Sequence, residues 1–472
     1  MLFPTIDFAI FFVVVFLVHW LLNPFRLPWK LFMIGASYVF YAWWDPSFVW
    51  LLVGFSVITQ VGALAVVGNR NKAKRQRMWV LAVALIAAFA PLLWFKYYVF
   101  TALNVSTVAG WFGGGEPLPL MQIVLPIGIS FYTFMGVSYV IDIHRGKIEP
   151  AGWVDVFLYL SFFPHLVAGP IVRSNELIPQ FAKRKDPRRI DVSMASYLIM
   201  AGLFKKVVLS SFVATSIVDP VFADPGSHTS PEILVAIYGY AVQIYADFSG
   251  YTDIAIGLAL LLGFKFPQNF DRPYTAVSLQ DFWRRWHMTL SRWLRDYLYI
   301  PLGGNRLGET RTYVNIMLTM LLGGLWHGAA WTFVVWGAIH GTGQVVGHYR
   351  RTHGLEKPAE NTQQRVIKQI VTFNIVCLGW VFFRSDSIGT AFDMLAGLVT
   401  RFGAAPLITL PVLGAIALGI GMQYLPQGPS ERIRVVFSRM TPVVQGVVLA
   451  LGLLVISTLG PQGVAPFIYF QF

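Results

Sequence analysis

The sequence predicts an all-helical protein that crosses a membrane many times. Apolar residues make up 56% of the 472 residues and charged residues only 12%, which is about half the roughly 25% found in soluble domains. The mean hydropathy is +0.60, and apolar runs long enough to cross a bilayer recur along the chain. A water-soluble fold cannot bury this much apolar surface. We therefore expect a polytopic membrane protein with about 11–13 transmembrane helices.

The apolar runs define about twelve candidate spans, each close to the roughly 20 residues that a transmembrane helix needs. The run at 231–262 is longer than the others and contains Gly250, so we expect a break there. The segment 264–312 is too rich in charged residues to span. The candidate spans are 6–22, 29–44, 47–67, 78–100, 121–141, 193–217, 231–262, two within 313–347, 366–383, 407–425 and 441–459.

The basic residues predict the orientation of these spans. The net charge is +13, and Lys and Arg favour the cytoplasmic side of a membrane. Four basic clusters, at 70–77, 183–189, 350–368 and 432–439, all fall on one side if the N-terminus lies outside the cytoplasm. We expect a bacterial cytoplasmic membrane protein in contact with anionic lipids. Nucleic-acid binding is not expected, because no reading module accompanies the charge.

Cysteine usage and missing motifs exclude several classes of chemistry. The single cysteine, Cys377, rules out an internal disulfide or a zinc ribbon. The chain has no phosphate-binding G-x-x-x-x-G-K-[ST] loop, no G-x-S-x-G elbow and no H-E-x-x-H motif. ATP-driven transport, serine hydrolysis and metal catalysis are therefore not expected, and neither is a bound cofactor or metal.

A re-entrant segment is predicted between two basic boundaries. Residues 154–172 are apolar but interrupted by Pro164 and by Gly169 and Pro170. Broken backbone at membrane depth is tolerated only where it is buried in protein or lines a cavity. His165 lies in this segment and can line such a cavity.

Residues 281–298 alternate arginine and tryptophan with helical spacing. On a continuous helix, Trp283, Trp286 and His287 share one face with the leucines, and the arginines occupy the other. Such a helix lies at a membrane interface, where its cations attract an anionic donor such as coenzyme A or a carrier-bound phosphopantetheine. An interfacial anchor without substrate contact is the alternative for these residues. The cations are Arg284, Arg285, Arg292 and Arg295.

The segment 321–341 carries the strongest candidate for catalysis. His327 lies midway between basic boundaries at Arg311 and Arg350, so this stretch of chain must enter the membrane and return. Glycines at 323, 324 and 328 allow close helix packing or a break. An ionisable group at that depth is costly and is a functional candidate by default. A neutral imidazole there can take a proton from a hydroxyl as its oxygen attacks an acyl carbonyl. His340 follows in a similar setting, where a structural role is favoured.

Polar residues also interrupt the apolar sequence QIYADFSGYTDIAIG at 243–257. Carboxylates in such a setting can orient a histidine or bind a cation, although more often they tie helices together. We include Tyr245 and Asp247 among the candidate substrate-binding residues.

At these residues the sequence resembles the membrane-bound O-acyltransferase (MBOAT) family, and most closely its bacterial alginate O-acetyltransferase branch. The resemblance is collinear over roughly 1–385. It rests on QNFDRPYTAVSLQDFWRRWHMTLSRWLRDYLYIPLGGNR and LLGGLWHGAAWTFVVWGAIHG, with support from SFFPHLVAGPIVR, IYADFSGYTDIAIG and WVFFR.

The resemblance implies a single transmembrane domain over 1–472 with a catalytic core at about 121–385. Its fold would have re-entrant and interfacial helices and a funnel on each face of the membrane. His327 matches the catalytic histidine of the W-H-G motif, and His287 matches the second histidine of bacterial members. We expect His327 to act as the general base and His287 to position the donor or steady the oxyanion. Trp326 and Asn305, within or beside these motifs, complete the candidate substrate-binding residues.

The resemblance also implies substrates and partners. The expected donor is acetyl-coenzyme A, or an acyl-carrier thioester, on the cytoplasmic side. The expected acceptor is an exopolysaccharide or cell-wall polymer, reached through a periplasmic or extracellular SGNH-type acetyltransferase partner. D-alanyl transfer to teichoic acid is the alternative within the same chemistry. A transporter that moves an acyl donor or sugar without chemistry is the alternative from another class. A polysaccharide synthase is disfavoured, because Q-x-x-x-R-R-W at 280–286 has the wrong spacing.

Overall fold

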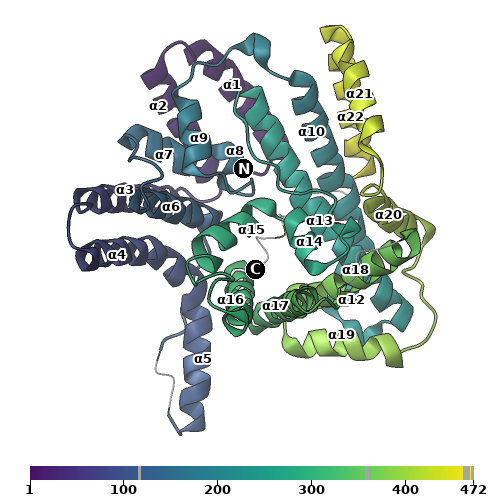
Figure 1. Cartoon of the computed structure of the whole chain (residues 1–472). Helices are drawn as coiled ribbons and strands as arrows, with labels where there is room; N and C mark the ends of the chain where they lie inside the picture. The colour runs from purple at the N-terminus through teal and green to yellow at the C-terminus, as the bar shows by residue number, and fades with distance from the viewer. Residues whose placement is uncertain (115–117, 357–360, 461–467, 469–472) are drawn as a thin grey trace. The chain divides into compact units, whose positions relative to one another are not determined.

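The computed structural model describes residues 1–114, 118–356, 361–460 and 468. Part of the third basic cluster, at 357–360, and part of the loop after Gly114 lie outside this range. Every regular element in the described residues is helical, as Figure 1 shows. The chain forms two compact units, one of residues 1–190 with 258–267 and one of residues 191–257 with 268–472. The single functional domain with a core at 121–385 stays a prediction.

Several helices have the length and composition of membrane spans. Among the described residues, five are both long and apolar enough, and three shorter apolar helices of 10–17 residues accompany them. The prediction of an all-helical polytopic membrane protein is therefore confirmed. The five are Ser47–Gly68, Lys74–Trp111, Val192–Ala223, Thr362–Arg384 and Pro442–Leu459.

The first unit begins with the helices that the sequence predicts most closely. Helix α1 covers the predicted run 6–22, where Thr5 caps it by accepting a hydrogen bond from the backbone N–H of Phe8 at 3.3 Å. Helix α4 continues through a π-helical turn into α5, which turns away from α4 in Figure 1. The helices of this unit are α1 Ile6–Leu22, α2 Arg26–Ala42, α3 Ser47–Gly68, α4 Lys74–Leu92, α5 Tyr98–Trp111, α6 Ile129–His144, α7 Trp153–Ser161, α8 Phe163–Leu166 and α9 Ser174–Phe181.

Two predictions in this unit are corrected or refined. The predicted span at 121–141 begins only at Ile129, because Pro126 and the left-handed Gly128 (φ +76°) precede the helix. A Cβ at Gly128 would lie 2.4 Å from the carbonyl oxygen of Leu166, so only glycine fits. The segment 154–172 is interrupted as predicted, between α7 and α8. His165 on α8 is buried, and its Nε2 lies 3.1 Å from the carbonyl oxygen of Tyr159.

The second unit contains the candidate site. Helix α13 is continuous through Gly250, so the predicted break is wrong. Gly250 instead serves close packing, since a Cβ there would lie 2.8 Å from the carbonyl oxygen of Gly202 on α10. The helices are α10 Val192–Leu203, α11 Ser211–Val213, α12 Asp219–Ala223, α13 Ser230–Leu261, α14 Leu279–Arg285, α15 Met288–Leu294, α16 Glu309–His327, α17 Trp331–Thr352, α18 Thr362–Arg384, α19 Ile388–Thr400, α20 Leu410–Gly421, α21 Gln427–Ser438 and α22 Pro442–Leu459.

Candidate functional site

His327 is the last residue of α16, at the turn of a tight helical hairpin with α17. Glycines bring the two helices into backbone contact. A Cβ at Gly324 would lie 2.2 Å from the carbonyl oxygen of Phe333, and one at Gly337 would lie 2.5 Å from that of Met320. Gly328 ends the helix directly after the histidine. The chain therefore reverses direction directly after His327, and its entry into the membrane stays a prediction.

The imidazole of His327 is enclosed by aromatic rings from three helices. Its ring centroid lies 4.9 Å from that of Trp326 on α16, 5.1 Å from that of Trp336 on α17 and 5.2 Å from that of Phe383 on α18. Only 3% of the residue is exposed. These rings hold the imidazole in an apolar setting, where polar interactions with a reacting group are stronger than in water.

His287 lies at a break in the segment predicted to be one helix. The continuous helix over 281–298 is wrong: α14 ends at Arg285, α15 begins at Met288, and a π-helical turn follows at Arg295–Tyr299. His287 itself has φ +41°, in the left-handed region that residues other than glycine rarely occupy. Such conformations persist only where surrounding structure enforces them, and they cluster at functional sites.

A loop remote in sequence replaces the helical hydrogen bonds at this break. The backbone N–H of Met288 donates to the carbonyl oxygen of Asn269 at 2.9 Å, and the N–H of Asp271 donates to the carbonyl oxygen of Arg285 at 2.9 Å. The broken ends are thereby satisfied without a continuous helix. His287 is fully buried as a result, with its ring centroid 4.7 Å from that of Phe248 on α13.

Asn269 also fixes the protonation of the His287 ring. Its Oδ1 accepts hydrogen bonds from the backbone N–H of Thr289 at 3.1 Å and from the Thr289 hydroxyl at 2.9 Å. The same oxygen lies 3.2 Å from Nδ1 of His287. Because this oxygen can only accept, Nδ1 carries the proton of the neutral ring and Nε2 carries the lone pair. Sequence reasoning missed Asn269, since nothing local distinguishes it from a loop asparagine.

One tryptophan contacts both candidate histidines. The ring centroid of Trp326 lies 6.1 Å from that of His287 and 4.9 Å from that of His327. Trp326 is itself buried, with 4% of the residue exposed. The structure therefore brings together three residues predicted for the site, from two segments about forty positions apart.

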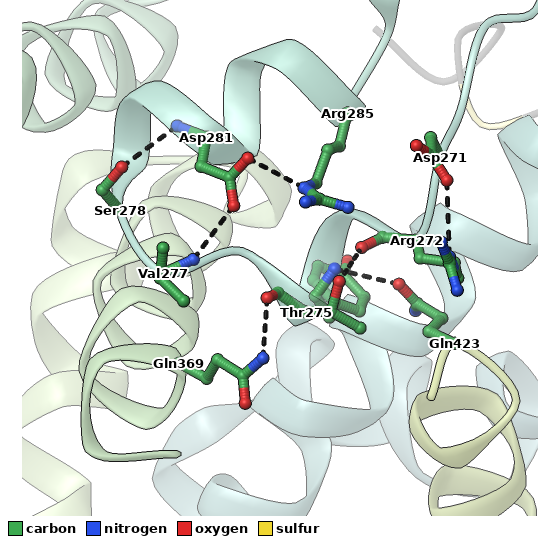
Figure 2. A network of polar contacts seen from close by, with 10 residues as sticks. Asp271, Arg272, Thr275, Val277, Ser278, Asp281, Arg285, Gln369 and Gln423 are labelled. Atoms are coloured by element: carbon green, nitrogen blue, oxygen red, sulfur yellow. Dashed lines mark hydrogen bonds and ion pairs between the residues drawn. The ribbon is translucent and has the colours of Figure 1, made fainter. Parts of the chain in front are cut away.

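A polar network holds the loop that leads to His287 (Figure 2). Ser278 caps α14 by accepting from the N–H of Asp281 at 3.1 Å, and Asp281 accepts from the N–H of Val277 at 3.2 Å. Gln369 on α18 donates to the carbonyl oxygen of Thr275 at 2.8 Å. These hydrogen bonds attach the loop to α14 and to α18. They therefore fix the path of the chain that leads to His287.

The four predicted donor-attracting arginines differ in their surroundings. Arg285 forms an ion pair with Asp281 at 2.9 Å (Figure 2), and Arg295 forms one with Asp296 at 2.7 Å. Arg284 is exposed and Arg292 is half-buried. The charge of Arg285 is therefore used in local structure. Arg284 remains a candidate for attracting the donor, because its side chain is exposed.

The two predicted tryptophans of the segment 281–298 belong to a buried aromatic cluster. The indole N–H of Trp283 donates to Nδ1 of His340 at 3.3 Å, which agrees with a structural role for that histidine. Trp286 packs with its ring centroid 5.1 Å from that of Trp380. Both indoles are buried. Their packing supports the chain around the helix break at His287.

Asp247 is bound to a lysine that sequence reasoning missed. Lys206 and Asp247 form a buried ion pair, and Asp247 also accepts from the N–H of Ile468 at 2.9 Å. Lys205 forms a second ion pair, with Asp253. Two adjacent lysines within a predicted span, opposite two carboxylates in another, were the signal available in the sequence. This geometry favours a helix-tying role for Asp247.

The remaining candidates lie apart from the histidines' immediate contacts. Tyr245 is 8% exposed and packs with its ring centroid 6.1 Å from that of Phe270. Asn305 is exposed in the turn before α16. In the described part of the chain, no group of three or more His, Cys, Asp or Glu side chains is arranged to hold a metal ion.

Comparison with known proteins identifies the family. Residues 138–385, which include both histidines and Trp326, match the model of the membrane-bound O-acyltransferase family. The chain belongs to this family. It is therefore a membrane-bound acyltransferase, as the motifs predict.

Three relatives illustrate the range of this family. A probable alginate O-acetylase AlgI of Azotobacter vinelandii is 39% identical over 84% of this chain and 78% of its own length. A peptidoglycan O-acetyltransferase of Helicobacter pylori is 37% identical over 80% of this chain and 75% of its own length. A teichoic acid D-alanyltransferase of Streptococcus thermophilus is 28% identical over 54% of this chain and 68% of its own length. The membrane-bound O-acyltransferases named for O-acetyl transfer thus resemble this chain over more of its length.

Proposed function

We propose that the protein transfers acetyl groups from a cytoplasmic thioester donor across the bacterial cytoplasmic membrane, for O-acetylation of an exopolysaccharide or cell-wall polymer. The observation that carries the proposal is the contact of one indole, Trp326, with both His287 and His327. The relatives named for alginate and peptidoglycan O-acetylation support the acetyl group and the polymer acceptor.

His327 is proposed as the general base. Its imidazole takes the proton of an acceptor hydroxyl as that oxygen attacks the carbonyl carbon of the acetyl thioester. The tetrahedral intermediate then collapses, the C–S bond breaks, and the proton passes from the imidazolium to the departing thiolate. Proton and charge balance without a cofactor. The aromatic rings around His327 exclude water that would otherwise hydrolyse the thioester.

His287 is proposed as a positioning group. With its proton on Nδ1, held at Asn269, the neutral ring presents a lone pair at Nε2. That nitrogen can accept a hydrogen bond from the attacking hydroxyl or from the donor. It cannot donate one to an oxyanion, so positioning is the better supported of the two roles expected for this histidine.

Orientation and partners complete the proposal. The basic clusters at 70–77, 183–189, 350–368 and 432–439 support a donor side in the cytoplasm and an N-terminus outside it. Arg284, exposed on α14, would attract the anionic donor on that side. An SGNH-type acetyltransferase outside the membrane would carry the acetyl group to the polymer.

The test is transfer of radiolabel from acetyl-coenzyme A into membrane-associated acceptor at matched expression. His327→Ala should reduce incorporation by about 10²–10⁴-fold, the usual contribution of a general base. His353→Ala is the matched control, because His353 is 42% exposed at the end of α17, and it should retain wild-type incorporation.

Two results would contradict the proposal. Undiminished incorporation by a folded His327→Ala protein would favour the transporter. Incorporation only from a D-alanyl-loaded carrier protein would favour teichoic acid D-alanylation.

A further inference from the structure

The first unit contains a basic pocket that none of the acyl-transfer residues shares. Residues from the start of α2 and from the chain that follows α9 line it. Four cations contribute: Arg26, Lys183, Arg184 and Lys185. Among the described residues that line the pocket, none is acidic. Positive charge concentrated in this way attracts anions and raises their local concentration.

The nearest carboxylate in sequence is engaged elsewhere. Asp186 follows Lys185 directly, but its side chain accepts from the backbone N–H of Arg188 at 3.0 Å and pairs with Arg189 at 3.4 Å. These contacts belong to the neighbouring turn, η2 Pro187–Arg189. Asp186 therefore does not neutralise the pocket.

Lys185 is held in place by three kinds of contact. Its backbone N–H donates to Oδ1 of Asn23 at 3.2 Å, and its carbonyl oxygen accepts from Nδ2 of the same residue at 2.8 Å. Its Nζ lies 4.2 Å from the ring centroid of Phe264. The methylene groups of the Lys185 side chain pack against Gly263, where a Cβ would lie 3.0 Å from Cγ of Lys185. Little side-chain freedom remains to be lost when this ammonium meets an anion.

The floor of the pocket is aromatic and equally fixed. Trp29 and Phe181 line it and are 5% and 2% exposed. The indole N–H of Trp29 donates to Nδ1 of His19 at 2.9 Å. Helix α2 begins here without a side-chain cap, so its first backbone N–H groups add to the positive end of the site.

The surroundings indicate which anion belongs in this pocket. Apolar side chains are exposed beside it: Leu21 is 73% exposed, Phe25 61% and Leu27 56%. They flank Arg26 in sequence at the junction of α1 and α2. A ligand with a phosphate at one end and hydrocarbon at the other would satisfy the cations and these side chains together.

We propose that this pocket binds the phosphate of a phosphate ester, and that its occupant is the headgroup of an acidic phospholipid. Arg26, Lys183, Arg184 and Lys185 contact the phosphate oxygens, and the exposed apolar side chains of the α1–α2 junction contact the acyl chains. The proposal does not depend on the acyl-transfer reaction.

The experiment measures lipid retention by the purified full-length protein in native mass spectrometry, with phosphatidylglycerol and phosphatidylcholine as probes. The wild type should retain phosphatidylglycerol over phosphatidylcholine. Lys183→Gln with Arg184→Gln should weaken phosphatidylglycerol binding on the order of tenfold. Both side chains are exposed, so the double variant should unfold at the wild-type temperature in phosphatidylcholine.

Lys72→Gln with Arg75→Gln is the matched control, because it also removes one exposed lysine and one exposed arginine, and neither lines the pocket. It should bind phosphatidylglycerol as the wild type does. Equal binding by the pocket variant and this control would overturn the proposal.

A third arm, competition by coenzyme A, separates the two sources of phosphate. Displacement of phosphatidylglycerol from the wild type at micromolar coenzyme A would assign the pocket to a soluble phosphate ester and overturn the lipid as occupant. Absence of displacement would support the lipid.

Discussion

The amide oxygen of Asn269 lies 3.2 Å from Nδ1 of His287 and so determines which nitrogen of the ring carries the proton. The same oxygen accepts two hydrogen bonds from Thr289, at the start of α15. One loop residue therefore controls both the tautomer of the histidine and the helix break that holds it.

Asn269→Ala should lower kcat by about ten- to a hundredfold with a smaller change in KM, because His287 loses its fixed orientation. Asn269→Asp keeps the three hydrogen bonds and should retain most of the activity. Steady-state acetyl transfer with both variants is the measurement. An equal loss of activity in the two variants, with unchanged unfolding temperatures, would show that the tautomer is unimportant.

The ion pair of Lys206 and Asp247 should matter for stability more than for chemistry. Asp247→Leu leaves a buried ammonium without its carboxylate and should cost about 3–5 kcal/mol. Adding Lys206→Met removes the uncompensated charge and should recover much of that loss. Thermal unfolding of the detergent-solubilised protein, followed by tryptophan fluorescence, measures both. A stable, inactive Asp247→Leu protein would instead return Asp247 to the substrate-binding residues.

The close packing of the α16–α17 hairpin predicts that a larger residue is not tolerated at Gly324 but is tolerated at Gly347. Gly324→Ala places a Cβ 2.2 Å from a backbone oxygen, so the helices must separate and His327 must move. We expect loss of most activity and a lower unfolding temperature. Gly347→Ala on α17 meets only the flexible end of Arg351 at 3.4 Å and should be close to wild type. Comparable activity of the two variants would contradict this account of the hairpin.

Binding at the basic pocket should depend on pH through Lys185. Burial, with a contribution from Lys183, lowers the pKa of Lys185 to about 8. The ammonium that binds phosphate is therefore present below pH 8 and lost as the pH rises above it. Phosphatidylglycerol affinity should fall several-fold between pH 7 and pH 9. Lys185→Arg keeps its charge over this range and should show a flat profile, measured by the same lipid titration at each pH. A wild-type affinity that stays constant would exclude Lys185 from the site.

Much of the fold follows from hydrophobic patterning, and the exceptions have identifiable physical causes. Helix α1 matches its predicted span because a long apolar run and a threonine cap are both local signals. Helix α13 is unbroken at Gly250 because the glycine meets a neighbouring backbone, which sequence spacing alone does not reveal.

The candidate residues of the site can be identified from the sequence, but their arrangement in space cannot. The two histidines are recognisable from their settings in the sequence. The break at His287 depends on backbone hydrogen bonds in which Asn269 accepts and Asp271 donates, and these residues lie about 16 to 18 positions away. Helical periodicity over 281–298 carries no trace of those bonds, so it predicts one helix where the structure has two.

The backbone contact between α16 and α17 also bears on which acyl groups the enzyme can accept. On one side, the surroundings of His327 consist of the closely packed backbones of α16 and α17, which no side-chain substitution can make smaller. Substitution can instead make room for a longer acyl chain at the rings of Trp326, Trp336 and Phe383. Trp336 and Phe383 are therefore where a preference for a two-carbon group over a longer one would be set, because Trp326 also supports His287.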